Sequence, residues 1–175
     1  ERVLDLRSGT LSRSVDWVSP AGQRVRIRTV RLVSFTQRSI AAIRYEVEPI
    51  DEPARLILQS ELVANEDLPS IGDDPRVAAV LASPLQAEEH HHSVHSALLV
   101  HVTRRSGLRV AAGMDHVIET TERIAVTTES HPDWARTTIT CEMRPGQVLR
   151  VVKFLGYGWS SQRSRPALRD QVHAA

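Results

Sequence analysis

Apolar and polar residues alternate with a period of two along most of this chain. Between residues 11 and 17, Leu11, Val15 and Trp17 occupy odd positions, and serine or aspartate occupies the even ones. Residues 41–47 repeat the alternation. Because successive side chains of a β-strand point to opposite faces, this pattern predicts antiparallel strands with one face buried and one face in water. On this interpretation Trp17 lies in the core.

Turn sequences separate the alternating segments. Residues 19–22, 104–107 and 144–147 each contain a glycine, and two of these segments also contain a proline. Glycine accepts backbone angles that other residues avoid, and proline favours the early positions of a turn. We therefore expect Gly107 and Gly146 to be turn residues that can hold a positive φ.

The alternation breaks at two places. Residues 65–76 are rich in Asn, Asp, Pro and Gly, which predicts a loop, and strands resume near 77–81 and 94–103. Residues 164–172 alone have helix-like spacing. The sequence therefore predicts an all-β fold, an antiparallel β-sandwich of about a dozen strands with at most a short C-terminal helix.

Composition argues against several classes of partner. The net charge is +1, which gives no reason to expect nucleic acid or an anionic membrane as partner. Cys141 is the single cysteine, so a disulfide framework and a cysteine-based zinc site are excluded. No apolar run approaches the ~20 residues of a membrane span, and no signal-peptide pattern begins the chain. We expect a soluble, cytoplasmic protein without a cofactor.

The most conspicuous polar cluster is histidine-rich. Glu88 and Glu89 precede three consecutive histidines at 90–92, and His95 follows. On a helix, His91 and His95 would share a face and could bind a metal, whereas on a strand His90 and His92 would share one face. The surrounding pattern is typical of a strand, which favours a polar edge or loop crossing over a metal site.

No catalytic constellation is evident from the residues alone. Asp73 and Asp74 precede Pro75 and are better explained as caps of backbone N–H groups in a turn than as a carboxylate pair. Cys141 stands on an alternating strand, as a small buried hydrophobe would. No phosphate-binding glycine loop or nucleophile motif is present.

Several longer segments resemble one known family. The runs LDLRSGTLSRSVDW and PAGQRVRIRTVRLVS near the start, then RRSGLRVAAGMDH and PGQVLRVVKFLGY, occur in the order found in the N-terminal domain of glycoside hydrolase family 65. The resemblance covers about residues 2–162. It implies a β-sandwich related to the galactose mutarotase-like super-sandwich, which in this family precedes a catalytic (α/α)6 barrel.

The resemblance also implies a division of labour. Residues 1–162 would form the N-terminal sandwich domain, incomplete at its start, and residues 163–175 would begin the linker to the barrel. The barrel carries the general acid and the phosphate site, so this chain would hold no catalytic residue. The whole protein would be an inverting phosphorylase or hydrolase of trehalose, maltose or kojibiose, acting as a homo-oligomer, with this domain supporting the barrel and the dimer.

Two other functions stay open at this point. A stand-alone carbohydrate-binding sandwich would need exposed aromatic rings, and Trp134, Tyr157 and Trp159 are the candidate sugar-contacting residues. A mutarotase-like enzyme would need an acid and a base on one sheet face, for which His101, His116 and Glu142 are candidates.

Overall fold

The computed structural model describes residues 1–66 and 83–175, which form eleven strands and one helix. In chain order the elements are β1 (Arg2–Asp5), β2 (Thr10–Val18), β3 (Arg24–Val33), β4 (Ile40–Pro49), β5 (Ala54–Val63), β6 (Leu85–His92), β7 (Ala97–Thr103), β8 (Arg109–Glu119), β9 (Ile124–His131), β10 (Trp134–Met143), β11 (Leu149–Ser160) and α1 (Arg165–His173). The all-β prediction with a short C-terminal helix is confirmed. The predicted strand at 77–81 and the turn at Asp73–Asp74 lie outside the described residues.

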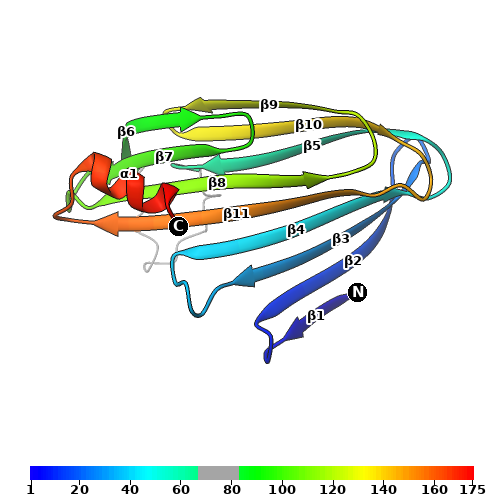
Figure 1. Cartoon of the computed structure of the whole chain (residues 1–175), viewed down its shortest axis with the longest axis horizontal. Coiled ribbons are helices and arrows are strands. Elements are labelled where there is room, and N and C mark those ends of the chain that lie inside the picture. The colour runs from blue at the N-terminus through cyan, green and yellow to red at the C-terminus, as the bar shows by residue number, and fades with distance from the viewer. Residues whose placement is uncertain (67–82) are drawn as a thin grey trace, which may run out of the picture.

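The strands form two antiparallel sheets of unequal size. The larger sheet has eight strands in the order β1-β2-β3-β4-β11-β8-β7-β6, and the smaller has three in the order β5-β10-β9. The smaller sheet packs on the part of the larger one that contains β7, β8 and β11. In Figure 1, β1, β2 and β3 continue away from β5, β9 and β10. The sandwich is therefore two layers deep over only part of its width.

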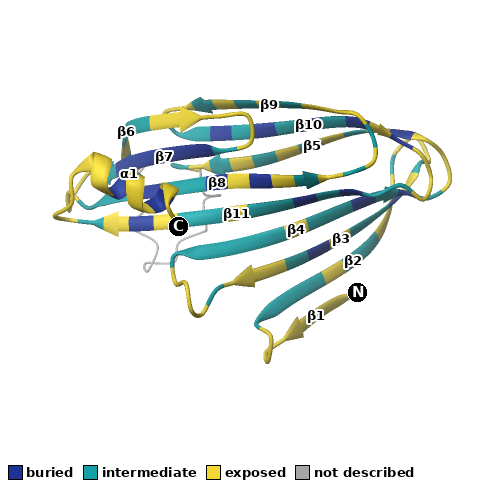
Figure 2. Ribbon diagram, viewed as in Figure 1, coloured by how far each residue is buried: buried dark blue, intermediate teal, exposed yellow. Residues whose placement is uncertain are grey.

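The core lies where the two sheets overlap. Ile139 and Met143 of β10 pack against Leu149 and Val151 of β11, and all four are almost fully buried. Burial of each such side chain contributes roughly 1.5–3 kcal/mol. Figure 2 shows buried segments on β7, β10 and β11, whereas β1 is exposed along its whole length.

Helix α1 covers the opposite face of the larger sheet. Leu168 and Val172 of the helix pack on Leu98 and Val100 of β7. The close approach depends on glycine: a Cβ built on Gly158 would lie 2.9 Å from a methyl carbon of Val172. Ser164 caps the helix through its side-chain oxygen, which accepts from the backbone N–H of Ala167. No helix in the described residues is long and apolar enough to cross a membrane.

The expected burial of Trp17 is wrong, although its predicted face is right. Trp17 lines the inner side of β2 together with Val25 and Ile27 of β3, but 48% of its surface is exposed. The reason is the width of the smaller sheet, which among the described strands ends at β5 and leaves β2 uncovered. Alternation identifies the face of a strand, but it does not show whether another layer covers that face.

The turn glycines provide a direct stability test. Gly107 and Gly146 hold φ values of +63° and +83°, which confirms the turn prediction. No atom lies within 4 Å of a Cβ built at either position, so only backbone strain opposes a larger residue. We expect Gly146→Ala and Gly107→Ala each to destabilise the fold by ~1 kcal/mol. Unchanged melting midpoints in both variants would contradict this expectation.

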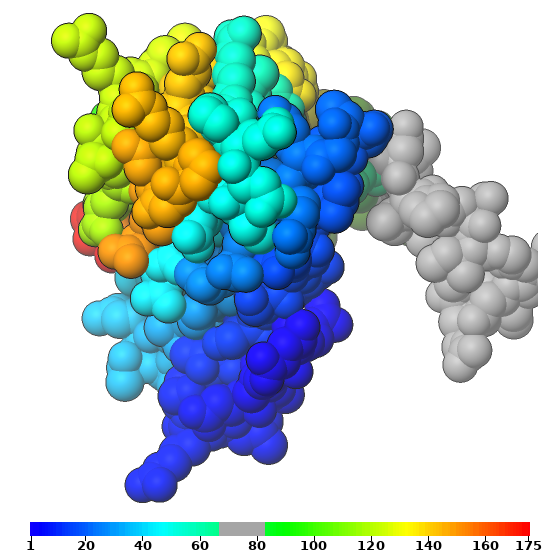
Figure 3. Space-filling view, turned by 90° about the vertical axis from the view of Figure 1, so that its right-hand side faces the viewer, coloured from blue at the N-terminus to red at the C-terminus, as the bar shows by residue number. Residues whose placement is uncertain are grey.

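The uncovered strands predict self-association of the chain on its own. Exposed apolar side chains gather on β1 to β3 and the loops beside them; they are Val3, Leu4, Leu6, Trp17, Val18, Leu32, Val33 and Phe35. Figure 3 shows these N-terminal strands in blue at one end of the molecule. Leu98 and Val100 of β7 do not belong to this surface, because they are buried under α1.

We therefore expect dimers or larger species at ~100 µM, a concentration at which an interface of about 5–6 kcal/mol is half occupied. Sedimentation at increasing concentration measures this. A strict monomer at that concentration would show that the exposed apolar surface does not drive association.

Candidate functional site

The histidine tract lies on a strand, as its surroundings predict. His90 and His92 of β6 both place Nδ1 near the hydroxyl of Ser130 on β9, at 3.1 and 2.9 Å. His91 points to the other face, where its Nε2 lies 2.6 Å from Glu89. Within residues 1–66 and 83–175, no three metal-ligating side chains converge. The tract therefore joins β6 to β9 on one face and approaches α1 on the other.

The two glutamates before this tract form ion pairs with arginines of other elements. Glu88 receives two hydrogen bonds from Arg109 of β8, at 2.5 and 2.8 Å, and these hydrogen bonds lower its pKa. Glu89 pairs with Arg165 and Arg169 of α1, at 3.0 and 3.2 Å. Burial raises the pKa of Glu89, but hydrogen bonds from His91 and Arg169 outweigh it and the pKa is lowered. Both carboxylates are thus ionised and used in structural pairs.

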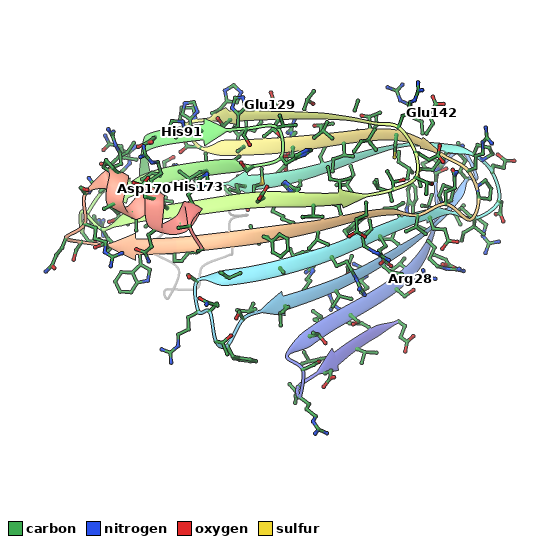
Figure 4. The ribbon with its side chains drawn as sticks, in the orientation of Figure 1. Arg28, His91, Glu129, Glu142, Asp170 and His173 are labelled. Atoms are coloured by element: carbon green, nitrogen blue, oxygen red, sulfur yellow. The ribbon has the colours of Figure 1, made fainter. Side chains whose placement is uncertain are left out.

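The three candidates for mutarotase chemistry do not meet. His101 lies opposite Val110 of β8, whereas His116 lies six residues further along that strand, or about 20 Å away. His101 contacts Asp133 at 3.0 Å. Glu142 is exposed on β10, and Figure 4 shows it at the opposite end of the molecule from His91 and the helix residue His173. These residues therefore form no acid–base pair.

A buried polar link between the sheets includes His116 itself. Its Nδ1 donates to the backbone oxygen of His95 at 2.7 Å, because a carbonyl oxygen can only accept. In the neutral ring Nε2 then accepts from the hydroxyl of Ser60 on β5 at 2.8 Å. Burial is the main cause of the lowered pKa of His116, and the charge of Lys153 adds to it. Among the described residues, the backbone oxygen of His95 rather than a carboxylate orients the ring that contacts Ser60.

Lys153 forms a second link between the sheets. This residue of β11 is the only lysine in the chain, and its Nζ donates to the backbone oxygen of Glu61 on β5 at 2.7 Å. Burial lowers its pKa. Sequence reasoning missed both Ser60 and Lys153, although a lone lysine within an apolar strand is a signal that could have identified the second.

These links border a concave surface, which we call the inter-sheet groove. It has a volume of about 480 Å³ and is mostly apolar. Its lining residues are Trp17, Val25, Ile27, Ile43, Tyr45, Val47, Leu56, Ile57, Leu58, Gln59, Ser60, Glu61, Leu149, Val151 and Lys153. Burial raises the pKa of Tyr45. An apolar hollow with a few polar groups suits either a ligand or an apolar segment of polypeptide.

The candidate sugar-contacting residues fall into two places. Trp134 stacks on His131, with centroids 4.4 Å apart, and the guanidinium of Arg136 lies 4.9 Å from its ring centroid. The Trp134 ring therefore packs against two side chains of the smaller sheet. Tyr157 and Trp159 lie two residues apart on β11 and are 48% and 63% exposed. Only these two are brought together.

Comparison with known proteins agrees with this architecture. The family model described as glycosyl hydrolase family 65, N-terminal domain, matches residues 1–175. The chain is 57% identical over its full length to an uncharacterized glycosyl hydrolase of Mycobacterium tuberculosis strain H37Rv. It is 25% identical over 90% of its length to an α,α-trehalose phosphorylase of Thermoanaerobacter brockii.

The solved structure of a putative kojibiose phosphorylase from the human microbiome has the same fold. It superposes with a TM-score of 0.81 over 99% of this chain, at 15% identity. This chain corresponds to 21% of that chain, and to 22% and 20% of the two curated relatives. It therefore spans about a fifth of the length of the proteins that it matches.

The buried histidine predicts a pH dependence of stability. The pKa of folded His116 lies below the ordinary 6.5, so the unfolded chain binds a proton at a pH where the folded chain does not. The stability that neutral His116 contributes is therefore present above pH 6.5 and is lost as pH falls below that value. Lys153, Asp115 and His95 are the charged or titratable groups that act on it.

We expect the free energy of unfolding to fall more steeply between about pH 7 and pH 5 in the wild type than in His116→Gln. Denaturant titrations of both proteins across this range measure the difference in slope. Because both proteins contain the other histidines, the effect of those residues cancels when the two curves are compared. Parallel curves for the two proteins would show that His116 is not kept neutral by the fold.

Proposed function

The chain belongs to the family of glycosyl hydrolase family 65 N-terminal domains, and we propose that it is the non-catalytic β-sandwich domain of a disaccharide phosphorylase or hydrolase. The substrate of the whole protein is an α-linked glucose disaccharide: trehalose, maltose or kojibiose. The domain supports a catalytic (α/α)6 barrel that lies elsewhere in the longer protein. Residues 1–162 are the sandwich, and residues 163–175 begin the connection to the barrel.

One observation carries this proposal: the family match extends over the whole chain, yet the chain is only about a fifth as long as its relatives. The structure supports a non-catalytic role. In the described residues, Glu88 and Glu89 are held in pairs with arginines, and His101, His116 and Glu142 are far apart. A glycosidase needs two carboxyl groups on opposite sides of one bond, about 5–10 Å apart.

The chemistry of the whole protein then depends on its other part. A glutamic acid of the barrel protonates the glycosidic oxygen, and phosphate or water attacks the anomeric carbon from the opposite face, with inversion. The sandwich contributes by holding the barrel and a second subunit in place. We propose a cytoplasmic homo-oligomer, with disaccharide and phosphate as small-molecule partners of the barrel and with no cofactor.

A second candidate role is carbohydrate binding, and one observation favours it. Tyr157 and Trp159 present two exposed rings from one strand, an arrangement that suits stacking on a sugar. Titration of the chain with trehalose, maltose and kojibiose, followed by tryptophan fluorescence, separates the two roles. A saturable change that Trp159→Ala abolishes and Trp134→Ala retains would support sugar binding, and no change supports a supporting role alone.

We expect the 175-residue chain to show no phosphorolysis by itself. Incubation with each disaccharide and phosphate should release no glucose 1-phosphate above a buffer blank, because on this proposal the acid and the phosphate site belong to the barrel. The longer protein is the positive control and should release glucose 1-phosphate, or glucose if water is the nucleophile. Product formed by the short chain alone would contradict a non-catalytic role, and a longer protein inactive on all three disaccharides would contradict the proposed substrate class.

A further inference from the structure

The exposed rings of Tyr157 and Trp159 lie on the inner face of the larger sheet. Gly156 and Gly158, which alternate with them on β11, face Val172 of α1 on the outer side. Because successive side chains of a strand point to opposite faces, the two rings point to the side of the smaller sheet. They are nevertheless 48% and 63% exposed. The two residues therefore form an open aromatic platform at the end of β11.

The strand register places a histidine on the same face as this platform. Trp159 pairs with Val110 of β8, and Val110 pairs with His101 of β7. Residues directly opposite each other in antiparallel strands share a face, so His101 also points inward, two strand spacings or ~10 Å from Trp159. In the next row, Tyr157 pairs with Ala112. The short side chains of Val110 and Ala112 therefore form a floor between the aromatic rings and the histidine.

Asp133 lies beside His101, in the turn between β9 and β10, and Figure 1 shows that β7, β9 and β11 finish at the same end of the molecule. Its Oδ1 lies 3.0 Å from Nε2 of His101 and accepts from Nδ2 of Asn65, also at 3.0 Å. The side chain of Asn65 is itself held by both backbone groups of Leu85. The side chain of His101 is 5% exposed, whereas that of Asp133 is 47% exposed. The carboxylate is thus fixed in direction and still reachable from solvent.

An aromatic platform and a fixed carboxylate on either side of a short floor suit a pyranose sugar. One face of a pyranose ring carries C–H groups that stack on an aromatic ring, and the hydroxyls at its rim can donate to a carboxylate. An anionic ligand would be repelled by Asp133. A quaternary ammonium ion prefers rings that surround it, whereas Tyr157 and Trp159 stand side by side on one strand. The arrangement therefore favours a neutral sugar over either kind of ion.

We propose that Tyr157, Trp159 and Asp133 bind a hexopyranose over the floor that Val110 and Ala112 form. The apolar face of the sugar stacks on the aromatic platform, and two neighbouring hydroxyls donate to the carboxylate of Asp133. The inference rests on the second role proposed above, carbohydrate binding, and adds to it the groups that select the ligand. The rings require a flat face, and the carboxylate requires hydroxyls at the rim of that face.

NMR titration of the 175-residue chain with glucose, maltose and trehalose tests this proposal. The amide of Ala112 and the indole N–H of Trp159 should shift saturably. Ala112→Leu fills the floor, and Asp133→Asn removes the charged acceptor, so each should raise the Kd about tenfold or more. The matched controls are Ala125→Leu and Glu129→Gln, at exposed positions of β9, and they should bind as the wild type does. Ala112→Leu leaves the hydrogen bonds of Asp133 intact, so it tests the site even if Asp133→Asn disturbs the fold.

Sorbitol, which carries similar hydroxyls on an open chain without a ring face, should not bind. The proposal is overturned by the absence of saturable shifts with every sugar, by an unchanged Kd in both Ala112→Leu and Asp133→Asn, or by sorbitol or choline binding as tightly as glucose. If Trp159→Ala abolishes sugar binding and the other two variants retain it, the carbohydrate-binding role stands and this site is wrong. Each of these failures leaves the proposed non-catalytic role intact, because that role is tested by product release.

Discussion

The packing of β10 and β5 on β11 and β8 is the interaction on which the rest of the structure depends. Ile139 and Met143 meet Leu149 and Val151 there, and this contact holds the smaller sheet over one part of the larger one. It also brings the backbone of β5 within reach of Lys153. Because the smaller sheet has only three described strands, the same contact leaves the inner side of β2 uncovered. The core, the polar links between the sheets and the groove therefore all result from the position of the smaller sheet on the larger one.

Burial of polar groups between the sheets is tolerated because each has a partner. No buried side-chain nitrogen or oxygen of residues 1–66 and 83–175 lacks a hydrogen bond. An unpaired group of this kind would cost roughly 1–3 kcal/mol, whereas a pair such as Ser60 with His116 contributes about 1 kcal/mol. These hydrogen bonds depend on direction, so they fix the alignment of the two sheets more strictly than apolar contacts alone would. They also explain why the pKa values of His116 and Lys153 are both lowered by burial without implying catalysis.

Much of the fold was predictable from the sequence, because the alternation of polar and apolar residues within a strand identifies its two faces. The alternation around Trp17 identified the correct face, and the turn glycines at 107 and 146 have the predicted positive φ. The layer that covers a face depends on residues distant in sequence, so the exposure of Trp17 could not be read locally. The same holds for Gly158, whose importance appears only where Val172 approaches it. The sequence pointed equally to Trp134, Tyr157 and Trp159 as sugar-contacting residues, and the stacking of Trp134 on His131 could not be read from it.

The two faces of the larger sheet are covered in two different ways. On the outer face, α1 is held by Leu168, by Val172 and by the arginine pairs with Glu89, so the C-terminal helix is firmly fixed to the sheet (Figure 1). On the inner face, the mostly apolar groove is open, and within the described residues β5 has a partner strand on one side only. The helix covers the outer face by apolar contacts and ion pairs, whereas the groove on the inner face is open among the described residues. Within the described residues, the two faces of the larger sheet are therefore covered differently: a helix held by apolar contacts and ion pairs lies on one face, and three strands that leave β2 uncovered lie on the other.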